Sequence, residues 1–259
     1  MTSTDAQDAQ PAVARLTVVV PAYNEEDRIG ATLERMTQYL GERGGPYDIL
    51  VVDDGSTDGT ADRVRRASEG APVALAHYGE NRGKGHAVRY GMLRAEGDLV
   101  LFSDADLATP IEELEKLLAA VEKGADIAIG SRDVAGARLE KRQSIVRELG
   151  GKAFNRCVQL LAVPGIHDTQ CGFKLFRRPV VEPVFSRCRI DNFSFDVEAL
   201  YVARLLGLRI AEVPVRWAHQ PGSKVRFVRD GLRMVRTLFR LRATDYRIAP
   251  HAALSKLGR

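Results

Sequence analysis

Asp98-Leu99-Val100-Leu101-Phe102-Ser103-Asp104-Ala105-Asp106 (residues 98–106) joins an apolar run of strand character to two carboxylates that stand one residue apart. In an α/β fold, a buried strand that ends this way delivers its acidic side chains to the carboxyl edge of the sheet, where ligands and hard divalent cations bind. Acidic residues also follow strands in ordinary solvated turns. The triplet alone therefore leaves a metal–diphosphate site and a simple turn both open.

Two further segments repeat this pattern of a strand followed by acids. Leu16 to Val20 is an apolar run that leads into Pro-Ala-Tyr-Asn-Glu-Glu (21–26), and Ile49 to Val52 leads into Asp-Asp-Gly-Ser-Thr-Asp (53–58). Helical patterns follow at 27–40 and 57–68, and Ser56 or Thr57 is the expected cap of the second helix. Because strand and helix alternate, the sequence predicts an α/β fold with a parallel sheet and right-handed crossovers.

Length and composition are typical of a single domain. With 259 residues, 45% of them hydrophobic, the chain can bury one core. We expect a disordered tail at 1–13, which lacks the features of a signal peptide, one domain at 14–224, and a basic helix and tail at 225–259. The three cysteines, at 157, 171 and 188, lack metal-ligand spacing, which predicts core thiols in a reducing compartment.

The segment Arg226 to Arg242 combines basic and apolar residues at helical spacing. One face carries Arg226, Arg229, Arg233, Arg236 and Arg240, and the opposite face carries Val228, Leu232, Val235, Leu238 and Phe239. Such a helix either docks on anionic lipid headgroups or packs on the sheet with a solvated basic face, and the net charge of +4 does not decide between the two. No apolar run is long enough to span a membrane, and no recognised motif predicts a nucleic-acid partner.

Four motifs, in order along the chain, resemble those of the GT-A type, family 2 inverting glycosyltransferases. They are Val-Val-Val-Pro-Ala-Tyr-Asn-Glu-Glu (18–26), Val-Val-Asp-Asp-Gly-Ser-Thr-Asp-Gly-Thr (51–60), Asn-Arg-Gly-Lys-Gly (81–85) and Asp-Ala-Asp (104–106). The resemblance runs from about residue 16 to about residue 224. It implies the Rossmann-like GT-A fold of nucleotide-diphospho-sugar transferases, a mostly parallel sheet flanked by helices.

The second half of the chain resembles the polyprenyl-phosphate branch of this family, nearest to the dolichyl-phosphate β-glucosyltransferases. The segments that carry this likeness are Gly-Ser-Arg (130–132), Asp-Thr-Gln-Cys-Gly-Phe-Lys-Leu-Phe (168–176) and Phe-Asp-Val-Glu (195–198). Mannose synthases of the branch commonly carry Asp-Ala-Asp-Leu-Gln. This chain has Ala108 at the Gln position, which argues against a mannosyl donor and against a side-chain metal ligand there.

The resemblance implies transfer of a hexose from a nucleotide sugar, with UDP-glucose favoured, to a polyprenyl or dolichyl phosphate. It also implies Mg²⁺ or Mn²⁺ as cofactor and a cytoplasmic enzyme, peripheral at the inner face of the membrane. Alternatives are the same chemistry with GDP-mannose, UDP-N-acetylglucosamine or a soluble hydroxyl acceptor. A different class is a non-catalytic sugar-nucleotide binding protein that regulates a membrane partner.

The donor site is expected at the strand ends. A divalent ion held by carboxylates stabilises a departing diphosphate, and Asp106 is the expected direct ligand. The resemblance assigns Asp104 to the ribose or to the outer shell of the metal. Asp53 is expected to accept the uracil N–H, although a capping turn would explain it and Asp54 as well. The other expected donor contacts are Pro21, Ala22, Tyr23, Glu25, Asp54, Lys84, Gly85 and Ala105.

The acceptor site is expected to be cationic. A lipid monophosphate is already an anion and attacks without losing a proton, so it needs positioning by guanidinium or ammonium groups rather than a general base. The resemblance favours Arg132 and Arg147, with Ser223 and Lys224 as a second cradle. Asp196 would serve as a base toward a hydroxyl acceptor, or would simply cap its helix.

Overall fold

The structure is a computed structural model that describes residues 14–141, 155–220 and 237–246. The tail 1–13, most of the basic segment 226–242 and the candidates Arg147, Ser223 and Lys224 lie outside the described residues. The predictions made for them are therefore not tested by the structure.

A seven-stranded sheet forms the centre of the fold, in the order β3-β2-β1-β4-β7-β5-β8. Its strands are β1 (Leu16–Ala22), β2 (Tyr47–Asp53), β3 (Val73–His77), β4 (Leu99–Ser103), β5 (Ile127–Ser131), β7 (Phe173–Arg177) and β8 (Ile210–Pro214). Only β7 runs antiparallel to its neighbours in this sheet. A separate two-stranded sheet pairs β6 (Arg138–Lys141) with β9 (Arg216–Ala218). The predicted α/β class with a mostly parallel sheet is confirmed.

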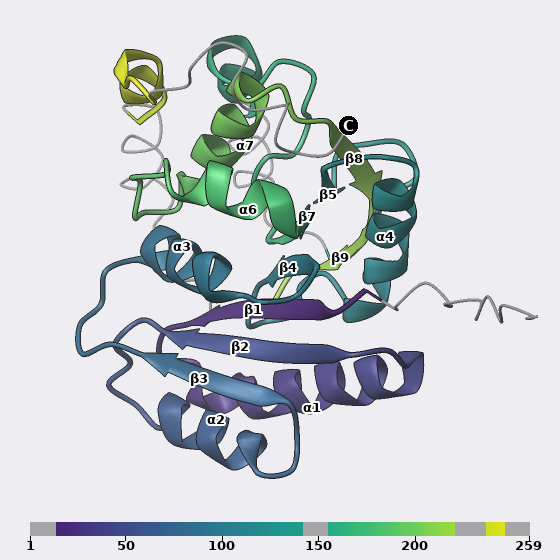
Figure 1. Ribbon diagram of the computed structural model, residues 1–259, viewed down its shortest axis with the longest axis vertical. Helices are drawn as coiled ribbons and strands as arrows, with labels where there is room; N and C mark the ends of the chain where they lie inside the picture. The colour runs from purple at the N-terminus through teal and green to yellow at the C-terminus, as the bar shows by residue number, and fades with distance from the viewer. Residues whose placement is uncertain (1–13, 142–154, 221–236, 247–259) are drawn as a thin grey trace, which may run out of the picture.

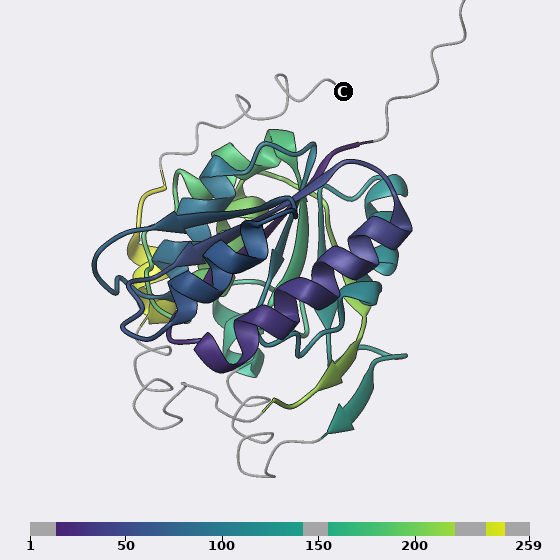
Figure 2. The same cartoon turned by 90° about the horizontal axis from the view of Figure 1, so that it is seen from below.

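Helices cover both faces of the seven-stranded sheet (Figure 1). One face carries α1 (Glu26–Arg43), α2 (Thr60–Ser68), η1 (Ile111–Glu113) and α4 (Leu114–Glu122). The other face carries α3 (Lys84–Arg94), α6 (Arg178–Phe185) and α7 (Phe195–Leu205). Figure 2, seen from the side of α1, shows this helix in front of the sheet, and Figure 1 shows it running alongside β1, β2 and β3. Val18 and Val20 pack with α1 while Val19 packs with α3, because successive strand side chains point to opposite faces.

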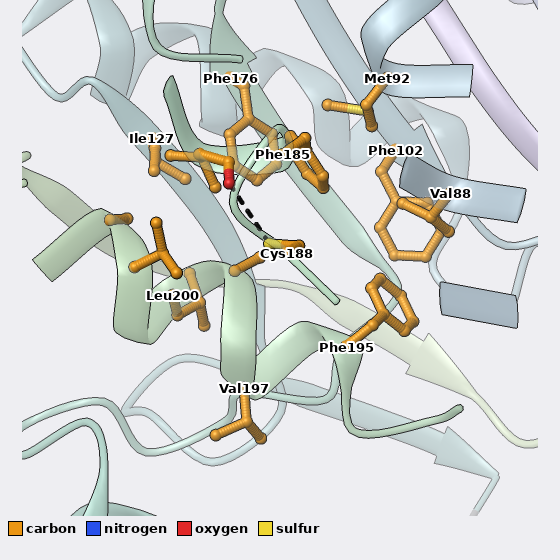
Figure 3. Close-up of a cluster of buried hydrophobic side chains, with 14 of the residues drawn as sticks. Val88, Met92, Phe102, Ile127, Phe176, Phe185, Cys188, Phe195, Val197 and Leu200 are labelled. Carbon is orange, nitrogen blue, oxygen red and sulfur yellow. Dashed lines mark hydrogen bonds between the residues drawn. The ribbon is translucent and has the colours of Figure 1, made fainter. Parts of the chain in front are cut away.

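The face with α3, α6 and α7 holds an aromatic core (Figure 3). The rings of Phe102 and Phe195 meet edge to face, with 5.6 Å between their centroids. All three cysteines are free thiols. Cys188 lies in this core and Cys171 is buried on the other side of the sheet, whereas Cys157 is exposed. The prediction of core thiols is therefore right for two of them and wrong for Cys157.

Two predicted helix caps are wrong because the side chains have other partners. α2 begins after Gly59 with no side-chain cap, since the Ser56 hydroxyl accepts the Asn24 N–H at 2.9 Å and thereby ties two loops together. α7 begins after Ser194, and Asp196 does not cap it. The Asp196 carboxylate instead pairs with Lys174, 2.5 Å away.

Residues 237–243 form a helix that closes the core over α7. Leu238 and Leu241 are fully buried, whereas Phe239 is 63% exposed. The sequence placed Leu238 and Phe239 on one apolar face. Consecutive helical residues are about 100° apart around the axis, so Leu238 faces the core while Phe239 faces solvent, and the predicted common apolar face is wrong for Phe239. Within the three described ranges, no helix has the length and apolar character needed to cross a membrane.

Candidate active site

The expected site residues gather at the carboxyl edge of the sheet. Asp53 ends β2 beside Ala22 of β1, Asp104 follows β4, and Arg132 follows β5. β7 inserts antiparallel between β4 and β5, so its start, rather than its end, lies at this edge. Gly172 consequently lies against Asp104: the Asp104 N–H donates to the Gly172 carbonyl at 3.1 Å, and a Cβ at position 172 would collide with the Asp104 carboxylate.

Lys84 and Asp104 form an ion pair at the centre of the site, with 2.6 Å between Nζ and Oδ1. Both side chains are about three-quarters buried. Burial alone would lower the pKa of Lys84, but the negative charges of Asp104 and then Asp196 outweigh burial and raise the pKa above its usual value. Lys84 thus stays an ammonium beside the carboxylate pair, as a phosphate-binding lysine requires.

Asp106 lies next to Asp104 and has fewer partners. Its Oδ1 accepts the Ala108 N–H at 3.0 Å. Burial and the nearby charge of Asp104 raise the pKa of Asp106, against the opposing effects of the hydrogen bond from the Ala108 N–H and of the charges of Lys84 and Arg28. Leu107, directly after it, has φ +46°, a left-handed conformation that is uncommon for a branched side chain. The turn after β4 is therefore held in a strained shape that turns the two carboxylates to the same edge.

Asp54 organises the loop that carries Lys84. Its Oδ1 accepts the Tyr78 hydroxyl at 2.9 Å and the Arg82 N–H at 2.8 Å. Its Oδ2 accepts the Asn81 side-chain amide at 3.0 Å and the Gly83 N–H at 2.9 Å. Burial and the hydrogen bond to Asp54 raise the pKa of Tyr78 well above its usual value. With both oxygens occupied in this way, Asp54 positions the loop before Lys84 and does not present its carboxylate to a ligand.

Asp53 is fully buried at the same turn. Its Oδ1 accepts the Ser56 N–H at 3.0 Å, and its Oδ2 lies 2.9 Å from Nδ1 of His77 at the end of β3. The His77 side chain is 44% exposed. The exposed member of this pair is thus the histidine, a residue that the sequence did not single out.

The loop after β1 forms the facing wall. Its Asn24 has φ +52°, and its side-chain oxygen accepts the Thr57 N–H at 2.8 Å, which fixes this loop against the one after β2. Glu25 donates its N–H to the Thr60 hydroxyl at 2.7 Å and pairs with Arg28 at 2.6 Å. Tyr23 is half-buried at the rim. The structure therefore brings the expected Pro21–Glu25 wall beside Asp53 and Asp54.

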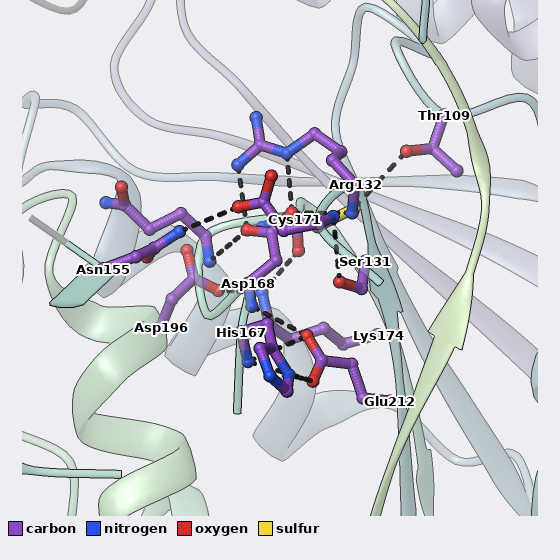
Figure 4. Close-up of polar contacts among 12 residues, drawn as sticks. Thr109, Ser131, Arg132, Asn155, His167, Asp168, Cys171, Lys174, Asp196 and Glu212 are labelled. Carbon is purple, nitrogen blue, oxygen red and sulfur yellow. Dashed lines mark hydrogen bonds and ion pairs between the residues drawn. The ribbon is translucent and has the colours of Figure 1, made fainter. Parts of the chain in front are cut away.

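Arg132 is held by Asp168 in a two-pronged ion pair (Figure 4). Nε donates to Oδ2 at 2.6 Å and Nη2 to Oδ1 at 2.9 Å, while Asp168 itself is fully buried. Nη1 has no partner among the described residues. The guanidinium also lies over the ring of Trp217, 5.3 Å from its centroid. Burial would lower the pKa of Arg132, but the Asp168 charge dominates and raises it.

Lys174 and Asp196 form a second buried pair at this end of the site. The Lys174 ammonium, 1% exposed, donates to Asp196 and to the Cys171 carbonyl, each at 2.5 Å. Burial raises the pKa of Asp196, and the charges of Lys174 and Lys84 oppose that rise. Lys84 and Lys174 both lie over the Phe102 ring, 5.6 and 5.7 Å from its centroid. Asp196 therefore stands between two lysines and joins the two ends of the site.

Lys174, His77, Arg28 and Trp217 were missed by the sequence analysis as site residues. For Lys174 a signal existed, because a lysine inside the apolar strand Phe-Lys-Leu-Phe (173–176) must find a buried anion. His77 and Trp217 carry no such signal. Their proximity to Asp53 and Arg132 arises from strand order and from the return of β9 to the site, where the Ala218 N–H donates to the Ala108 carbonyl at 2.8 Å.

Asp104 and Asp106 are the residues whose chemistry fits a divalent metal. Mg²⁺ and similar hard ions bind carboxylate oxygens, and at phosphate-transfer sites one or two carboxylates share them with substrate phosphates. In the part of the chain that the structure describes, no group of three or more His, Cys, Asp or Glu side chains could enclose a metal. The two carboxylates of Asp104 and Asp106 are a donor set of the kind that suits an ion shared with a diphosphate.

This fold, with carboxylates at the strand ends, is that of the GT-A proteins. Solved structures agree on the fold. Glucosyl-3-phosphoglycerate synthase from Mycobacterium tuberculosis, in complex with phosphoglyceric acid, matches with a TM-score of 0.65 and 20% identity over 92% of this chain and 82% of its own. Mannosyl-3-phosphoglycerate synthase from Rubrobacter xylanophilus matches with a TM-score of 0.64 and 24% identity over 88% of this chain and 72% of its own.

The sequence comparisons show the family. The sequence model of the family "Glycosyl transferase family 2" matches residues 17–185, and the chain belongs to this family. It is 38% identical over 240 residues to dolichyl-phosphate beta-glucosyltransferase of Dictyostelium discoideum, covering 88% of this chain and 73% of that protein. Identity to the enzyme of the same name from Drosophila melanogaster is 42% over 242 residues, covering 86% and 73%. The resemblance found in the motifs is confirmed.

Proposed function

We propose that this protein transfers glucose from UDP-glucose to a polyprenyl or dolichyl phosphate, with inversion at the anomeric carbon. The observation that carries the proposal is the conjunction of two features. The relatives at 38 and 42% identity bear the name dolichyl-phosphate beta-glucosyltransferase, and Asp104, Asp106 and Lys84 meet at the sheet edge as a nucleotide-diphosphate site requires.

The donor half of the site consists of the loops after β1, β2 and β4 and the start of α3. Asp106 would hold the divalent metal, and Asp104 would lie toward the metal or the ribose. The ammonium of Lys84 pairs with phosphate oxygens. The Asp53–His77 pair contacts the base, with His77 as its exposed member. Pro21, Ala22, Tyr23 and Glu25 form the facing wall, and Asp54 acts through Lys84 by fixing the loop before it.

A divalent ion at Asp106 supplies positive charge for the departing diphosphate. Mn²⁺ with uridine diphosphate occupies a crystal structure of the M. tuberculosis synthase, which supports the metal class without deciding between Mg²⁺ and Mn²⁺ here. The protein's own contribution is preorganisation: Lys84 is fixed on Asp104, and the strained turn at Leu107 fixes Asp106.

The acceptor half consists of Arg132 after β5, the loop 167–172, Lys174 on β7 and Asp196 on α7. A lipid monophosphate is already an anion, so no residue has to remove a proton in the transfer step. Asp168 fixes the plane of the Arg132 guanidinium and leaves Nη1 for the acceptor phosphate. Arg147, Ser223 and Lys224 are further candidates for that phosphate, on the resemblance alone.

We extend the proposal to the place of action, at the inner face of a membrane where a lipid phosphate is presented. In support, Phe239 is 63% exposed on the helix 237–243, next to the exposed Arg240. Arg242 of the same helix donates to the Leu161 carbonyl at 3.4 Å, beside Leu160, which is 75% exposed. Exposed apolar side chains among arginines are typical of surfaces that bind anionic lipid headgroups.

The test is product formation from a panel of nucleotide sugars with a short polyprenyl phosphate and either Mg²⁺ or Mn²⁺. We expect glucosyl lipid from UDP-glucose, little product from GDP-mannose or UDP-N-acetylglucosamine, and no product in excess chelator. Preference for another donor would overturn the glucose assignment. Binding of UDP-glucose without transfer to any acceptor would instead favour a non-catalytic regulator.

A further inference from the structure

The C-terminal segment 237–246 reaches the donor half of the site through one buried carboxylate. Glu198 of α7 is 1% exposed. Its Oε1 accepts the hydroxyl of Tyr246 at 3.0 Å. Its Oε2 accepts the N–H groups of Arg189 and Ile190 at 2.9 and 2.8 Å. A carboxylate that accepts bonds from two distant segments holds both in place, because leaving any of these buried donors unpaired is costly.

The loop held by Glu198 lies directly on the first turn of α3. The Gly85 N–H donates to the Asp191 carbonyl at 2.8 Å. A Cβ at Gly83 would collide with that carbonyl, and a Cβ at Gly85 would collide with the carbonyl of Ile190. Gly83 and Gly85 therefore pack directly against residues 190–191, and Lys84 is the residue between these two glycines. Arg89 of α3 adds a second tie, with Nη2 3.0 Å from Oδ1 of Asp191.

Tyr246 is itself held firmly. It is 5% exposed and its ring meets that of Tyr201 with 5.9 Å between centroids. Leu238 and Leu241 anchor the preceding helix in the cluster that also contains Val88 of α3. Burial, then the charge of Glu198, raises the pKa of Tyr246 well above its usual value, so the hydroxyl remains a donor.

We propose that Tyr246 is a positioning residue for donor binding: by completing the bonds of Glu198 it holds residues 189–191 over the first turn of α3 and so fixes Lys84 against Asp104. The inference rests on the proposed role of Lys84 in binding the donor. Residues 237–246 would then influence donor binding indirectly, through Glu198 and the loop 189–191.

The experiment measures the affinity of UDP with Mn²⁺ by calorimetry in four full-length proteins: wild type, Tyr246→Phe, Tyr39→Phe and Lys84→Met. Tyr39→Phe is the matched control, because its hydroxyl also donates to a glutamate, Glu115 at 2.9 Å, but lies on α1, on the opposite face of the sheet. Because Tyr246→Phe loses one hydrogen bond that positions Lys84, we expect it to bind UDP about fivefold more weakly than the wild type. We expect the UDP affinity of Tyr39→Phe to be unchanged. The Michaelis constant for UDP-glucose should rise while that for the lipid phosphate stays constant.

Urea unfolding of the two tyrosine variants separates positioning from general stability. We expect a larger loss for Tyr246→Phe, whose bond to Glu198 is buried, than for Tyr39→Phe, whose bond to Glu115 is exposed, so the donor affinities are compared under conditions where both variants are fully folded. If Lys84→Met weakens UDP binding but Tyr246→Phe behaves like Tyr39→Phe, the inference is overturned and the proposed donor site stands. If Lys84→Met binds UDP normally, the donor role of Lys84 falls, and the inference that rests on it falls too.

Discussion

The donor and acceptor halves use buried charge in different ways. In the donor half, Asp104 and Lys84 are each about one-quarter exposed and Asp106 has one backbone partner, so charge remains available to a ligand. In the acceptor half, Arg132–Asp168 and Lys174–Asp196 are close pairs whose carboxylates are almost completely buried. The donor half therefore leaves charge available to a bound ligand, whereas in the acceptor half most charged groups are paired with one another and fix the geometry of the site.

The largest expected effect tests the availability of charge in the donor half. Asp106→Asn removes the expected metal ligand but keeps the shape and the bond from the Ala108 N–H. We expect the transfer rate to fall at least about a hundredfold, or roughly 3 kcal/mol of transition-state stabilisation, with unchanged folding. Steady-state rates over a Mn²⁺ titration measure this. Asp27→Asn, an exposed acid on the first turn of α1, is the control and should retain the wild-type rate.

The next prediction tests whether the buried ion pair of the acceptor half stabilises the folded protein. Asp168→Asn leaves the guanidinium of Arg132 without a charged partner and should lower the free energy of unfolding by about 2 kcal/mol. Asp62→Asn on α2 breaks an exposed pair with Arg65 and should change it by less than about 0.5 kcal/mol. Equal losses in the two variants, measured by urea unfolding at neutral pH, would contradict the distinction between the halves.

The same pair predicts a pH dependence. Burial would raise the pKa of Asp168, but the charge and hydrogen bonds of Arg132 prevail and lower it. Because the unfolded chain, with a pKa of about 3.9, then binds the proton more readily, the pair's contribution is full above that pH and lost as pH falls through the lower folded-state value. Urea midpoints of the wild type should therefore drop more steeply below about pH 4 than those of Asp168→Asn.

The strand-end motifs were enough to predict the donor half, but they did not predict the ion pairs of the acceptor half. Asp53, Asp104 and their loops follow apolar runs, and parallel strands bring such residues to one edge whatever their separation along the chain. The partners Arg132 and Asp168 are 36 residues apart, and Lys174 and Asp196 are 22 apart. No local pattern pairs them, because the antiparallel insertion of β7 decides which side chains meet. The role of Asp54 in positioning the loop before Lys84 was likewise not predicted, because its partners lie 24 to 29 residues further along the chain.

A smaller effect separates residues that touch the donor from those that position them. Asp54→Asn replaces one acceptor oxygen by an NH₂ group, which then faces either the Arg82 N–H or the donors of Asn81 and Gly83. We expect the Michaelis constant for UDP-glucose to rise about tenfold, equivalent to about 1.4 kcal/mol, with a smaller change in kcat. Asp62→Asn again serves as control. A fall in kcat with unchanged affinity would instead place Asp54 among the residues that act on the transition state.

The smallest effect concerns the helix 237–243, where Phe239 and Arg240 face solvent. Truncation before residue 237 cannot test this surface, because Leu238 and Leu241 belong to the core and their removal would unfold it. Arg240→Gln keeps the helix and removes one charge, and Arg65→Gln on the opposite face of the sheet is the matched control. We expect severalfold weaker co-sedimentation of Arg240→Gln with anionic vesicles at low salt, a difference that fades as salt shortens the Debye length, and unchanged UDP affinity. Equal weakening in both variants, or equal binding to neutral vesicles, would show that the helix only packs, and the membrane would then have to meet the acceptor half through another surface.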